Sequence, residues 1–406
     1  MTAPIQAIRP KQTIDDLAIF GGPKLFDRPR PIGQLDLPDE EKFFAYARKI
    51  YESGCITNNG PLVQTLERQL CELHQVDHCV ALANASLGLI LLMEALADGR
   101  RGEVIMPAFT YPGLPHLAQW AGQYPRFCDV DPETHTLAPD AVEAAIGVET
   151  TAILAVHQVN SPCLIDELQA IGDAHGVPLF FDSVHGIHCT YNGRPLGSFG
   201  RAEIFSLHAT KLLNGFEGGY ATTNDGALAD TLRMKRNFGI DRSGSVATLG
   251  LNAKLNEAHA ALALSALDDQ EQIIRRNRER VEAYHRHFAQ IPSLVWIPYR
   301  GTRMNYEFAL LCVDPQWPLG RDVIVSVMRE ENALARPYYS PPLHLSSHCP
   351  PGMVPPHLPV TERLARGIIQ MPVGELVNEA DIMALAELMA FLFSHAPEVT
   401  SRLSRQ

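Results

Sequence analysis

From about residue 60 onward, short apolar runs rich in β-branched residues alternate with segments that have the Ala and Leu periodicity of helices. The runs predict strands at residues 79–83, 104–106, 127–130, 152–157, 178–182, 203–207 and 220–223. Strands that alternate with helices imply a mostly parallel sheet that is covered by helices on both faces. The pattern therefore predicts an α/β fold for this part of the chain.

The last third of the chain has a different pattern. A helical stretch from about Lys254 to about His287 has the length of a connector between two domains. Beyond it we expect a smaller α+β domain, with strands at 294–297 and 307–313 and helices that begin at Arg321 and Glu379. We place a large domain at residues 1–265 and a small one at 266–406. The first dozen residues predict a loose N-terminal arm, and the Pro-rich residues 337–359 predict a surface or interface loop.

Composition narrows the classes of partner. The formal net charge of -12 argues against a nucleic-acid or anionic-membrane surface, because both need clustered Lys and Arg. The 8 cysteines never fall at C-x-x-C spacing, which favours reduced thiols. The N-terminal sequence has no apolar signal-peptide region, and no apolar run approaches the ~18 residues of a membrane helix. We therefore expect a cytoplasmic protein that acts on a small molecule.

A polar tripeptide, Asn84-Ala85-Ser86, separates the first predicted strand from a helix-forming run. Free backbone N–H groups at such a helix start can bind a phosphate. Most strand-to-helix turns use these residue types simply to cap the helix, and taken alone that interpretation is the commoner one.

Asp182 ends an otherwise apolar strand, at the sheet edge where ligands of open α/β sheets bind. Its carboxylate could cap a helix, bind a metal or pair with a cationic ring nitrogen, and taken by itself helix capping is the first choice. Metal binding is the least favoured of the three, because no further acidic or His pair at ligand spacing accompanies it, and we predict no metal site.

Lys211 follows the strand at 203–207 in the sequence Ser206-Leu-His-Ala-Thr-Lys211, and the Gly-rich residues 214–219 come next. An amine in a tight loop between apolar residues is partly desolvated, which favours the neutral nucleophile. An exposed loop lysine is the commoner alternative. Together, however, the phosphate cradle, the carboxylate and the lysine are the three groups that pyridoxal phosphate requires at once.

The motif at residues 205–219 resembles the DegT/DnrJ/EryC1/StrS family of sugar aminotransferases, which are fold-type I pyridoxal-phosphate enzymes. The resemblance extends from Phe20-Gly-Gly-Pro to Gln370-Met-Pro-Val-Gly374. It implies pyridoxal 5′-phosphate as cofactor, with pyridoxamine phosphate as intermediate. Lys211 falls on the Schiff-base lysine of the family, Asp182 on the partner of the pyridine nitrogen, and His185 on the residue that lies against the ring.

The resemblance also implies roles for residues outside this motif. For the cofactor, it implies that Ala85, Ser86 and Ser206 bind the phosphate and that Phe109 stacks on the ring, although Phe109 alone would be interpreted as a core residue. It also implies that Asn252 binds the phosphate of a neighbouring subunit's cofactor, and hence a homodimer. The roles for the substrate fall on Tyr338, Tyr339 and His344, with Arg28 and Arg30 as further partners for a nucleotide. His157 and His208 are expected to pack in the core or to support the residues that contact the cofactor, rather than to be catalysts.

The implied reaction moves an amino group from L-glutamate or L-glutamine to a keto-sugar. The patterns at residues 57–63, 236–239 and 252–254 resemble members that aminate C4 of a nucleotide-linked 4-keto-6-deoxyhexose. Residues 159–162 and 182–185 depart from the usual family pattern, so an aminocyclitol ketone or another non-nucleotide ketone stays an alternative substrate. Three other activities are weighed: a pyridoxamine-phosphate-dependent sugar dehydratase, a non-catalytic cofactor-binding protein, and a nicotinamide-dependent oxidoreductase, which is disfavoured because no G-x-G-x-x-G follows the first strand.

Overall fold

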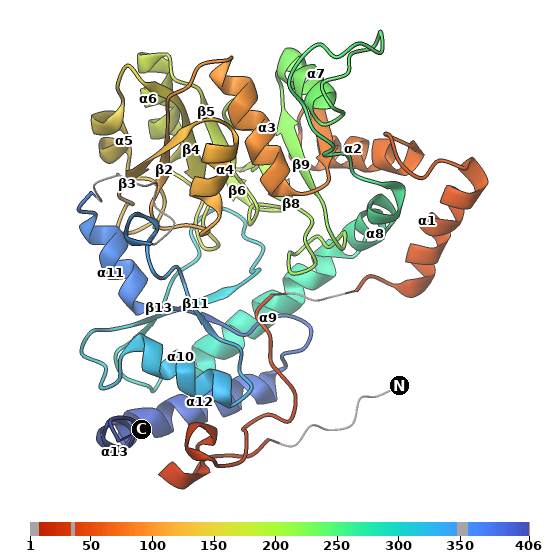
Figure 1. The fold of residues 1–406 in the computed structure, drawn as a ribbon. Coiled ribbons are helices and arrows are strands. Elements are labelled where there is room, and N and C mark those ends of the chain that lie inside the picture. Colours follow the sequence, from red (N-terminus) through yellow and green to blue (C-terminus); the bar gives the residue numbers. More distant parts are fainter. Residues whose placement is uncertain (1–7, 34–36, 347–355, 406) are drawn as a thin grey trace.

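The structure, a computed structural model, describes residues 8–33, 37–346 and 356–405 (Figure 1). Its largest sheet has 7 strands in the order β1-β9-β8-β5-β4-β2-β3. The strands are β1 (His78–Leu82), β2 (Glu103–Pro107), β3 (Tyr124–Cys128), β4 (Thr150–Val156), β5 (Leu179–Asp182), β8 (Glu203–Ser206) and β9 (Gly219–Thr223). Only β9 runs antiparallel to its neighbours, β1 and β8. The predicted mostly parallel sheet is confirmed.

Helices cover both faces of this sheet. Successive residues of each strand point to opposite faces, so apolar strands present apolar side chains on both. Val80 and Leu82 of β1 pack in a cluster with α3 (Ala85–Ala97), α4 (Leu114–Trp120) and α7 (Gly226–Lys235). Cys79 and Ala81 of the same strand face α2 (Pro61–His74) and α8 (Glu257–Leu267). On this second face, β4 and β5 pack against α5 (Pro139–Ala145) and α6 (Ile165–His175). The short hairpin of β6 (Thr190–Tyr191) and β7 (Arg194–Pro195) follows β5.

The connector is two helices rather than one. α8 ends at Leu267, and α9 (Gln270–Phe288) begins after Asp269, which is its N-cap residue. The prediction of a single continuous helix is therefore wrong at Asp268 and Asp269. Aspartate is a poor interior helix residue, and the carboxylate of Asp269 makes no capping hydrogen bond to α9 but accepts one from Lys42 Nζ at 2.7 Å. Lys42 belongs to α1 (Glu40–Ser53), which packs against α8.

Beyond α9 the chain forms a 4-stranded antiparallel sheet in the order β10-β11-β13-β12. Its strands are β10 (Leu294–Trp296), β11 (Ala309–Val313), β12 (Arg336–Pro337) and β13 (Ile368–Met371), and its helices are α10 (Arg321–Glu330), α11 (Pro359–Gly367), α12 (Glu379–Ser394) and α13 (Ala396–Leu403). The expected smaller α+β unit is present, although β12, β13 and α11 were not predicted. The division after residue 265, which falls inside α8, stays a prediction.

In the described residues no single helix has the length and apolarity to cross a membrane. Helices α12 and α13 meet these criteria only as a pair, and the pair is bent by 78°. Much of α12 is buried in the C-terminal core, including Leu385 and Met389. That burial matches the packing of a core helix.

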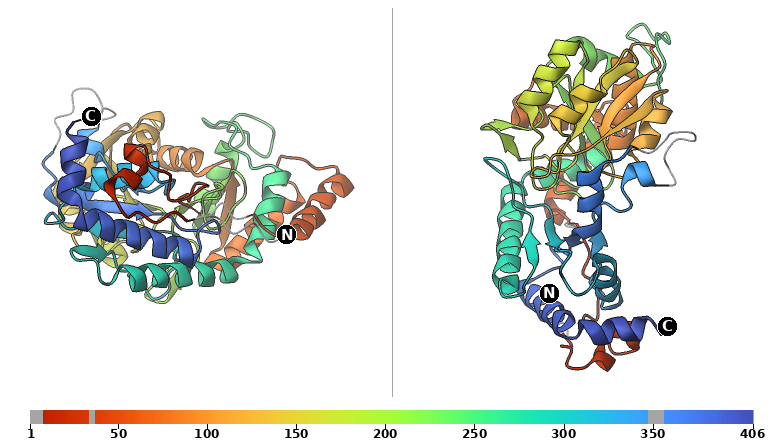
Figure 2. Two further views of the ribbon diagram at one scale, coloured as in Figure 1. Left: turned by 90° about the horizontal axis from the view of Figure 1, so that it is seen from below. Right: turned by 90° about the vertical axis from the view of Figure 1, so that its left-hand side faces the viewer.

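The N-terminal segment packs against the C-terminal unit (Figure 2). It contains two short 3-10 helices, η1 (Ile14–Asp16) and η2 (Ala18–Phe20). Lys11 Nζ lies 2.7 Å from Glu331 Oε2, and both side chains are buried. Leu25 and Phe26 join the C-terminal hydrophobic cluster. The prediction of a loose arm is therefore wrong for residues 8–12; residues 1–7 lie outside the described part of the chain, as do residues 347–355 of the predicted Pro-rich loop.

Candidate active site

Lys211 lies in the loop between β8 and β9, as the sequence predicted. Its backbone N–H donates to His208 O at 2.8 Å, and its Nζ lies 3.3 Å from His185 Nδ1. Burial lowers the pKa of Lys211, although the carboxylates of Glu307 and Asp182 oppose this shift. A lysine with a lowered pKa is more often in the neutral, nucleophilic form.

Asp182 ends β5 and is buried, with its Oδ1 3.2 Å from the backbone N–H of Val184. Burial raises the pKa of Asp182 to about 6, although this N–H group and the charges of Lys211 and His157 act in the opposite direction. Of the three interpretations of Asp182, helix capping is wrong, because the chain continues from β5 into turns and the β6–β7 hairpin. No group of three or more metal-ligating side chains was found among the described residues.

His185 follows β5 and meets a residue that the sequence analysis missed. Its Nδ1 lies 2.8 Å from Oε2 of Glu307, which is buried and stands just before β11. The signal was a lone carboxylate at the start of an apolar strand. Because Glu307 lies 122 positions from His185, no local pattern in the sequence connects the two.

The start of α3 lies beside the ends of β8 and β9. Gly219 pairs in register with Leu82 of β1 on one side and with Ser206 of β8 on the other. A Cβ atom on Gly219 would lie 2.5 Å from the backbone nitrogen of Ala85, so only glycine permits this approach. Asn84 caps the helix by accepting a hydrogen bond from the Leu87 N–H at 2.8 Å. The cap is confirmed and pairs the Leu87 N–H, and phosphate binding at this turn stays a prediction.

Aromatic rings from distant segments surround Phe109. Its ring meets Tyr338 edge-on at 5.9 Å and Tyr339 at 5.5 Å between centroids. Gln158 links the two segments, because its Nε2 donates to Phe109 O and its Oε1 accepts from the Tyr338 hydroxyl, both at 2.9 Å. Phe109 is fully buried among these residues. Its stacking on the cofactor ring stays a prediction.

The other predicted residues are more dispersed. Ser86 is partly buried at the start of α3, and the Ser206 hydroxyl accepts from the His208 N–H at 3.2 Å. His344 is buried, with Nε2 3.5 Å from Glu362, and Asn252 is exposed before α8. Their predicted roles remain untested.

The two arginines proposed for a nucleotide differ in their surroundings. Arg30 is buried and forms a 2.8 Å ion pair with Asp381, so its side chain belongs to the core. Arg28 is exposed, and its carbonyl oxygen accepts from Arg30 at 2.9 Å. Among the two, only Arg28 presents a side chain to solvent. His157 packs as expected, with its ring stacked on Phe181 at 4.7 Å, whereas His208 is exposed and does not pack in the core.

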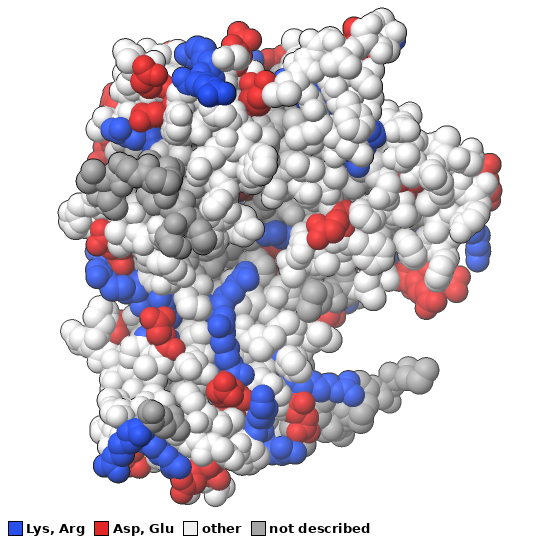
Figure 3. Space-filling model, in the orientation of Figure 1, with Lys and Arg blue, Asp and Glu red and all other residues white. Residues whose placement is uncertain are grey.

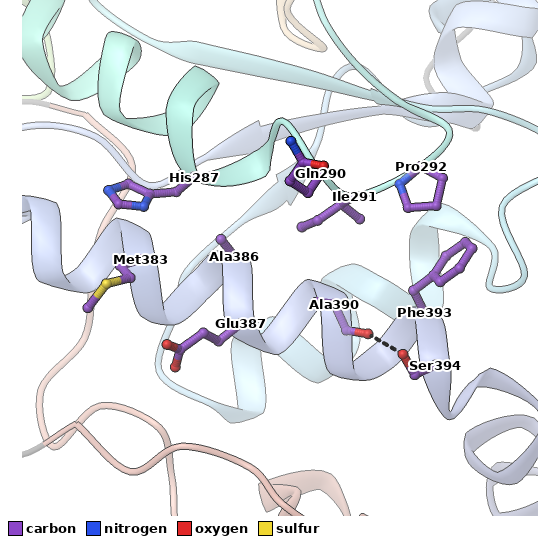
Figure 4. Close-up of a pocket in the computed structure, with 10 residues that line it drawn as sticks. All are labelled: His287, Gln290, Ile291, Pro292, Met383, Ala386, Glu387, Ala390, Phe393 and Ser394. Carbon is purple, nitrogen blue, oxygen red and sulfur yellow. Dashed lines mark hydrogen bonds between the residues drawn. The ribbon is translucent and has the colours of Figure 1, made fainter.

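An open groove of about 340 Å³ lies elsewhere, between the end of α9 and α12 (Figure 4). His287, Met383 and Phe393 are among the residues that line it, and none of the predicted site residues does. On the face shown in Figure 3, basic and acidic side chains are interspersed. Neither feature competes with the cluster around Lys211 as a site for chemistry.

The residues present fit pyridoxal phosphate, because a lysine of lowered pKa, a buried carboxylate and a glycine-lined helix start lie at one edge of the sheet. Comparison with known proteins identifies the class. The sequence profile of the DegT/DnrJ/EryC1/StrS aminotransferase family matches residues 38–390. The chain belongs to this family, and it is a pyridoxal-phosphate-dependent transaminase.

Several characterised relatives match along most of their length. The dTDP-4-amino-4,6-dideoxy-D-glucose transaminase of Escherichia coli is 28% identical over 371 residues, which are 89% of this chain and 98% of that protein. The crystal structure of DesI in the presence of its TDP-sugar product superposes with a TM-score of 0.91 at 38% identity, covering 97% of this chain and all of that one. DesV of S. venezuelae has a TM-score of 0.79 at 26% identity, with 87% and 94% coverage.

Proposed function

We propose that this transaminase moves an amino group from L-glutamate or L-glutamine to the keto group of a nucleotide-linked 4-keto-6-deoxyhexose, in amino-sugar biosynthesis. The observation that carries the proposal is the cluster of Lys211, His185 and Asp182, held in a chain that is 38% identical to DesI over 97% of its length. The relatives named for dTDP- and TDP-sugars support this substrate class over an aminocyclitol ketone.

The bound cofactor would supply an electron sink and a carrier for the amino group, in its pyridoxal and pyridoxamine forms. In this proposal Lys211 attaches the cofactor and, once displaced, moves protons at Nζ. In the same proposal Asp182 holds the ring-nitrogen proton, and the burial of its carboxylate at the end of β5 supports this role. The first N–H groups of α3, together with Ser86 and Ser206, would bind the phosphate.

The sugar nucleotide would lie against Tyr338, Tyr339 and His344, with Arg28 as a partner for negative charge. Support for this placement comes from the packing of both tyrosines against Phe109 and from the exposure of Arg28. A lysine at position 211 argues against the dehydratase alternative, because such enzymes tend to replace the lysine.

We also propose a homodimer in which Asn252 binds the phosphate of the neighbouring subunit's cofactor. Large apolar side chains are exposed on α1, on the loop after Lys211 and around the segment that contains Asn252. They are Phe44, Tyr51, Phe216, Phe238 and Leu249. Phe43 of α1 meets Phe216 with ring centroids 6.2 Å apart, so two of these segments adjoin, and an exposed apolar surface is typical of one that a second subunit covers.

The test separates the two halves of the reaction. L-glutamate or L-glutamine is added to the cofactor-loaded chain, and the visible absorbance of the bound pyridoxal form is expected to disappear. A keto-sugar nucleotide is then titrated in, and the same absorbance is expected to return. Lys211→Ala should lack both changes. If only a cyclitol ketone restored the absorbance, the substrate would be a cyclitol ketone and not a sugar nucleotide. If no amino acid changed the absorbance, the proposed amino donors would be wrong.

A further inference from the structure

The segment that leads into β11 delivers two polar side chains to the active site. Asn305 is buried, and its Nδ2 donates to the carbonyl oxygens of His185 and Ile187, both at 2.9 Å. Its Oδ1 accepts from the N–H of Glu307 at 3.1 Å. Glu307 is only 1% exposed, and its Oε2 lies 2.8 Å from His185 Nδ1. Asn305 therefore fixes the backbone on both sides of this contact.

The geometry locates one proton. Two lone pairs at 2.8 Å would repel each other, so a proton lies between Glu307 Oε2 and His185 Nδ1. Burial alone would raise the pKa of Glu307, but the neighbouring His185 and Lys211 hold it below its ordinary value. Burial and the charge of Lys211 lower the pKa of His185, although Glu307 opposes this. A neutral ring beside an ionised carboxylate carries its proton on Nδ1, which leaves the lone pair on Nε2.

Lys211 approaches the same ring atom, with Nζ 3.3 Å from Nδ1. Four charged or titratable groups act on this amine: Glu307, Asp182, Arg336 and His185. The two carboxylates favour a proton on Nζ, and the positive charge of Arg336 opposes it. Glu307 is therefore placed to act on the ring and on the amine together.

We propose that Glu307 is a positioning residue of the active site, which fixes the Nδ1-protonated form of His185 and stabilises a proton on Nζ of Lys211. Its use in amino transfer rests on the proposed function. The carboxylate acts through His185 and through its charge, and it comes from the C-terminal unit. The acceptor atom that His185 offers to a bound ligand is then Nε2.

The first test determines the tautomer of His185 in the full-length, cofactor-loaded chain labelled with ¹⁵N-histidine, by ring NMR spectra assigned with His185→Gln. Glu307→Gln keeps an acceptor oxygen but removes the charge, and Glu307→Ala removes both. The matched control is Glu379→Gln, at the exposed pair in which Glu379 lies 3.1 Å from His287. We expect the proton on Nδ1 in the unaltered chain, the control and Glu307→Gln, and partly on Nε2 in Glu307→Ala. A proton on Nε2 in the unaltered chain, or no change in Glu307→Ala, overturns the tautomer assignment.

The second test measures the charge effect. Only a neutral amine adds to an aldehyde, so the rate at which the cofactor-stripped chain combines with pyridoxal phosphate reports the titration of Lys211. In Glu307→Gln the midpoint of this pH profile should fall by about one unit, because a nearby opposite charge is lost. Glu379→Gln should leave it in place, and an unshifted midpoint in Glu307→Gln refutes the charge effect. Neither readout uses a keto-sugar, so a wrong sugar substrate would leave both tests intact, and circular dichroism checks that each variant folds.

Discussion

At the scale of single residues, Asp182 stands where two requirements conflict. The carboxylate is buried at the end of an apolar strand, and this burial raises its pKa to about 6. A ring nitrogen, however, is best held protonated by an ionised partner. The Val184 N–H and the charge of Lys211 lower the pKa of Asp182 only in part. Without the cofactor, the folded chain therefore holds a carboxylate at a cost in stability.

This cost should be visible in the pH dependence of unfolding. Between about pH 4 and the folded pKa of about 6, the folded chain binds a proton that the unfolded chain releases, so the free energy of unfolding falls as the pH rises. Above this window the free energy of unfolding is lower than its value below about pH 4 by on the order of 3 kcal/mol. In the cofactor-free protein, Asp182→Asn should remove this difference, making the variant more stable than the unaltered chain at pH 8 but not at pH 4. Urea unfolding at pH 4 and pH 8 measures the free energy of unfolding of both proteins. Equal values for the variant and the unaltered chain at pH 8 would contradict the prediction. The variant should also transfer amino groups much more slowly.

The sequence shows which residues can carry chemistry when the signal is local. Asp182 ends a strand and Lys211 lies in the loop that follows another, both in recognisable sequence patterns, and the structure brings both to one edge of the sheet. Glu307 and Gln158 could not be found in this way. Their partners, His185 and Tyr338, lie 122 and 180 positions away, so only the folded chain shows that these groups meet.

At the scale of elements, the site depends on how closely β9 approaches the start of α3. A Cβ atom on Gly219 would meet three backbone atoms, at 2.5 Å from Ala85 N, 2.7 Å from Asn84 C and 2.9 Å from Phe205 O. Backbone atoms cannot rotate away as the end of a side chain can. A side chain at position 219 must therefore displace β9, β8 or the first turn of α3.

Gly219→Ala should therefore weaken cofactor binding. We expect the dissociation constant for pyridoxal phosphate to rise by about 10-fold or more, which corresponds to roughly 1.4 kcal/mol. Fluorescence titration of the cofactor-stripped chain measures the constant. Gly147→Ala is the control, because an added Cβ there meets no atom within 4 Å. Equal affinities in the two variants would show that the close approach does not shape the phosphate site.

The sequence predicted elements best where they are long or regular. All strands of the large sheet were expected within a few residues of their observed positions, because apolar runs between helices are a strong signal. β12, with only Arg336 and Pro337, is too short to show any alternation. The break at Asp268 and Asp269 was missed because helix-forming residues continue on both sides of it, Ala and Leu in α8 and Glu, Gln and Arg in α9.

At the scale of the whole molecule, the two ends of the chain meet in one core. Leu17, Leu25 and Phe26 pack with residues of α10 and α12, and the buried pair of Arg30 and Asp381 joins positions 351 apart. No sequence pattern predicts such contacts. The C-terminal unit thus holds the N-terminal segment, while Glu307 contacts His185 and the tyrosines after β12 contact Phe109.

In the proposed dimer, two variants that are each impaired alone should complement each other. If Asn252 acts in the neighbouring active site, then Lys211→Ala and Asn252→Ala impair different residues of a shared site. In a mixed dimer, one site combines an intact Lys211 from one subunit with an intact Asn252 from the other, and the second site carries both changes. Unfolding and refolding the two variants together should restore about a quarter of the unaltered activity, since half of the dimers are mixed and each has one intact site. Each variant refolded by itself is the control, and a mixture no more active than their average would mean that Asn252 serves its own subunit or that no dimer forms.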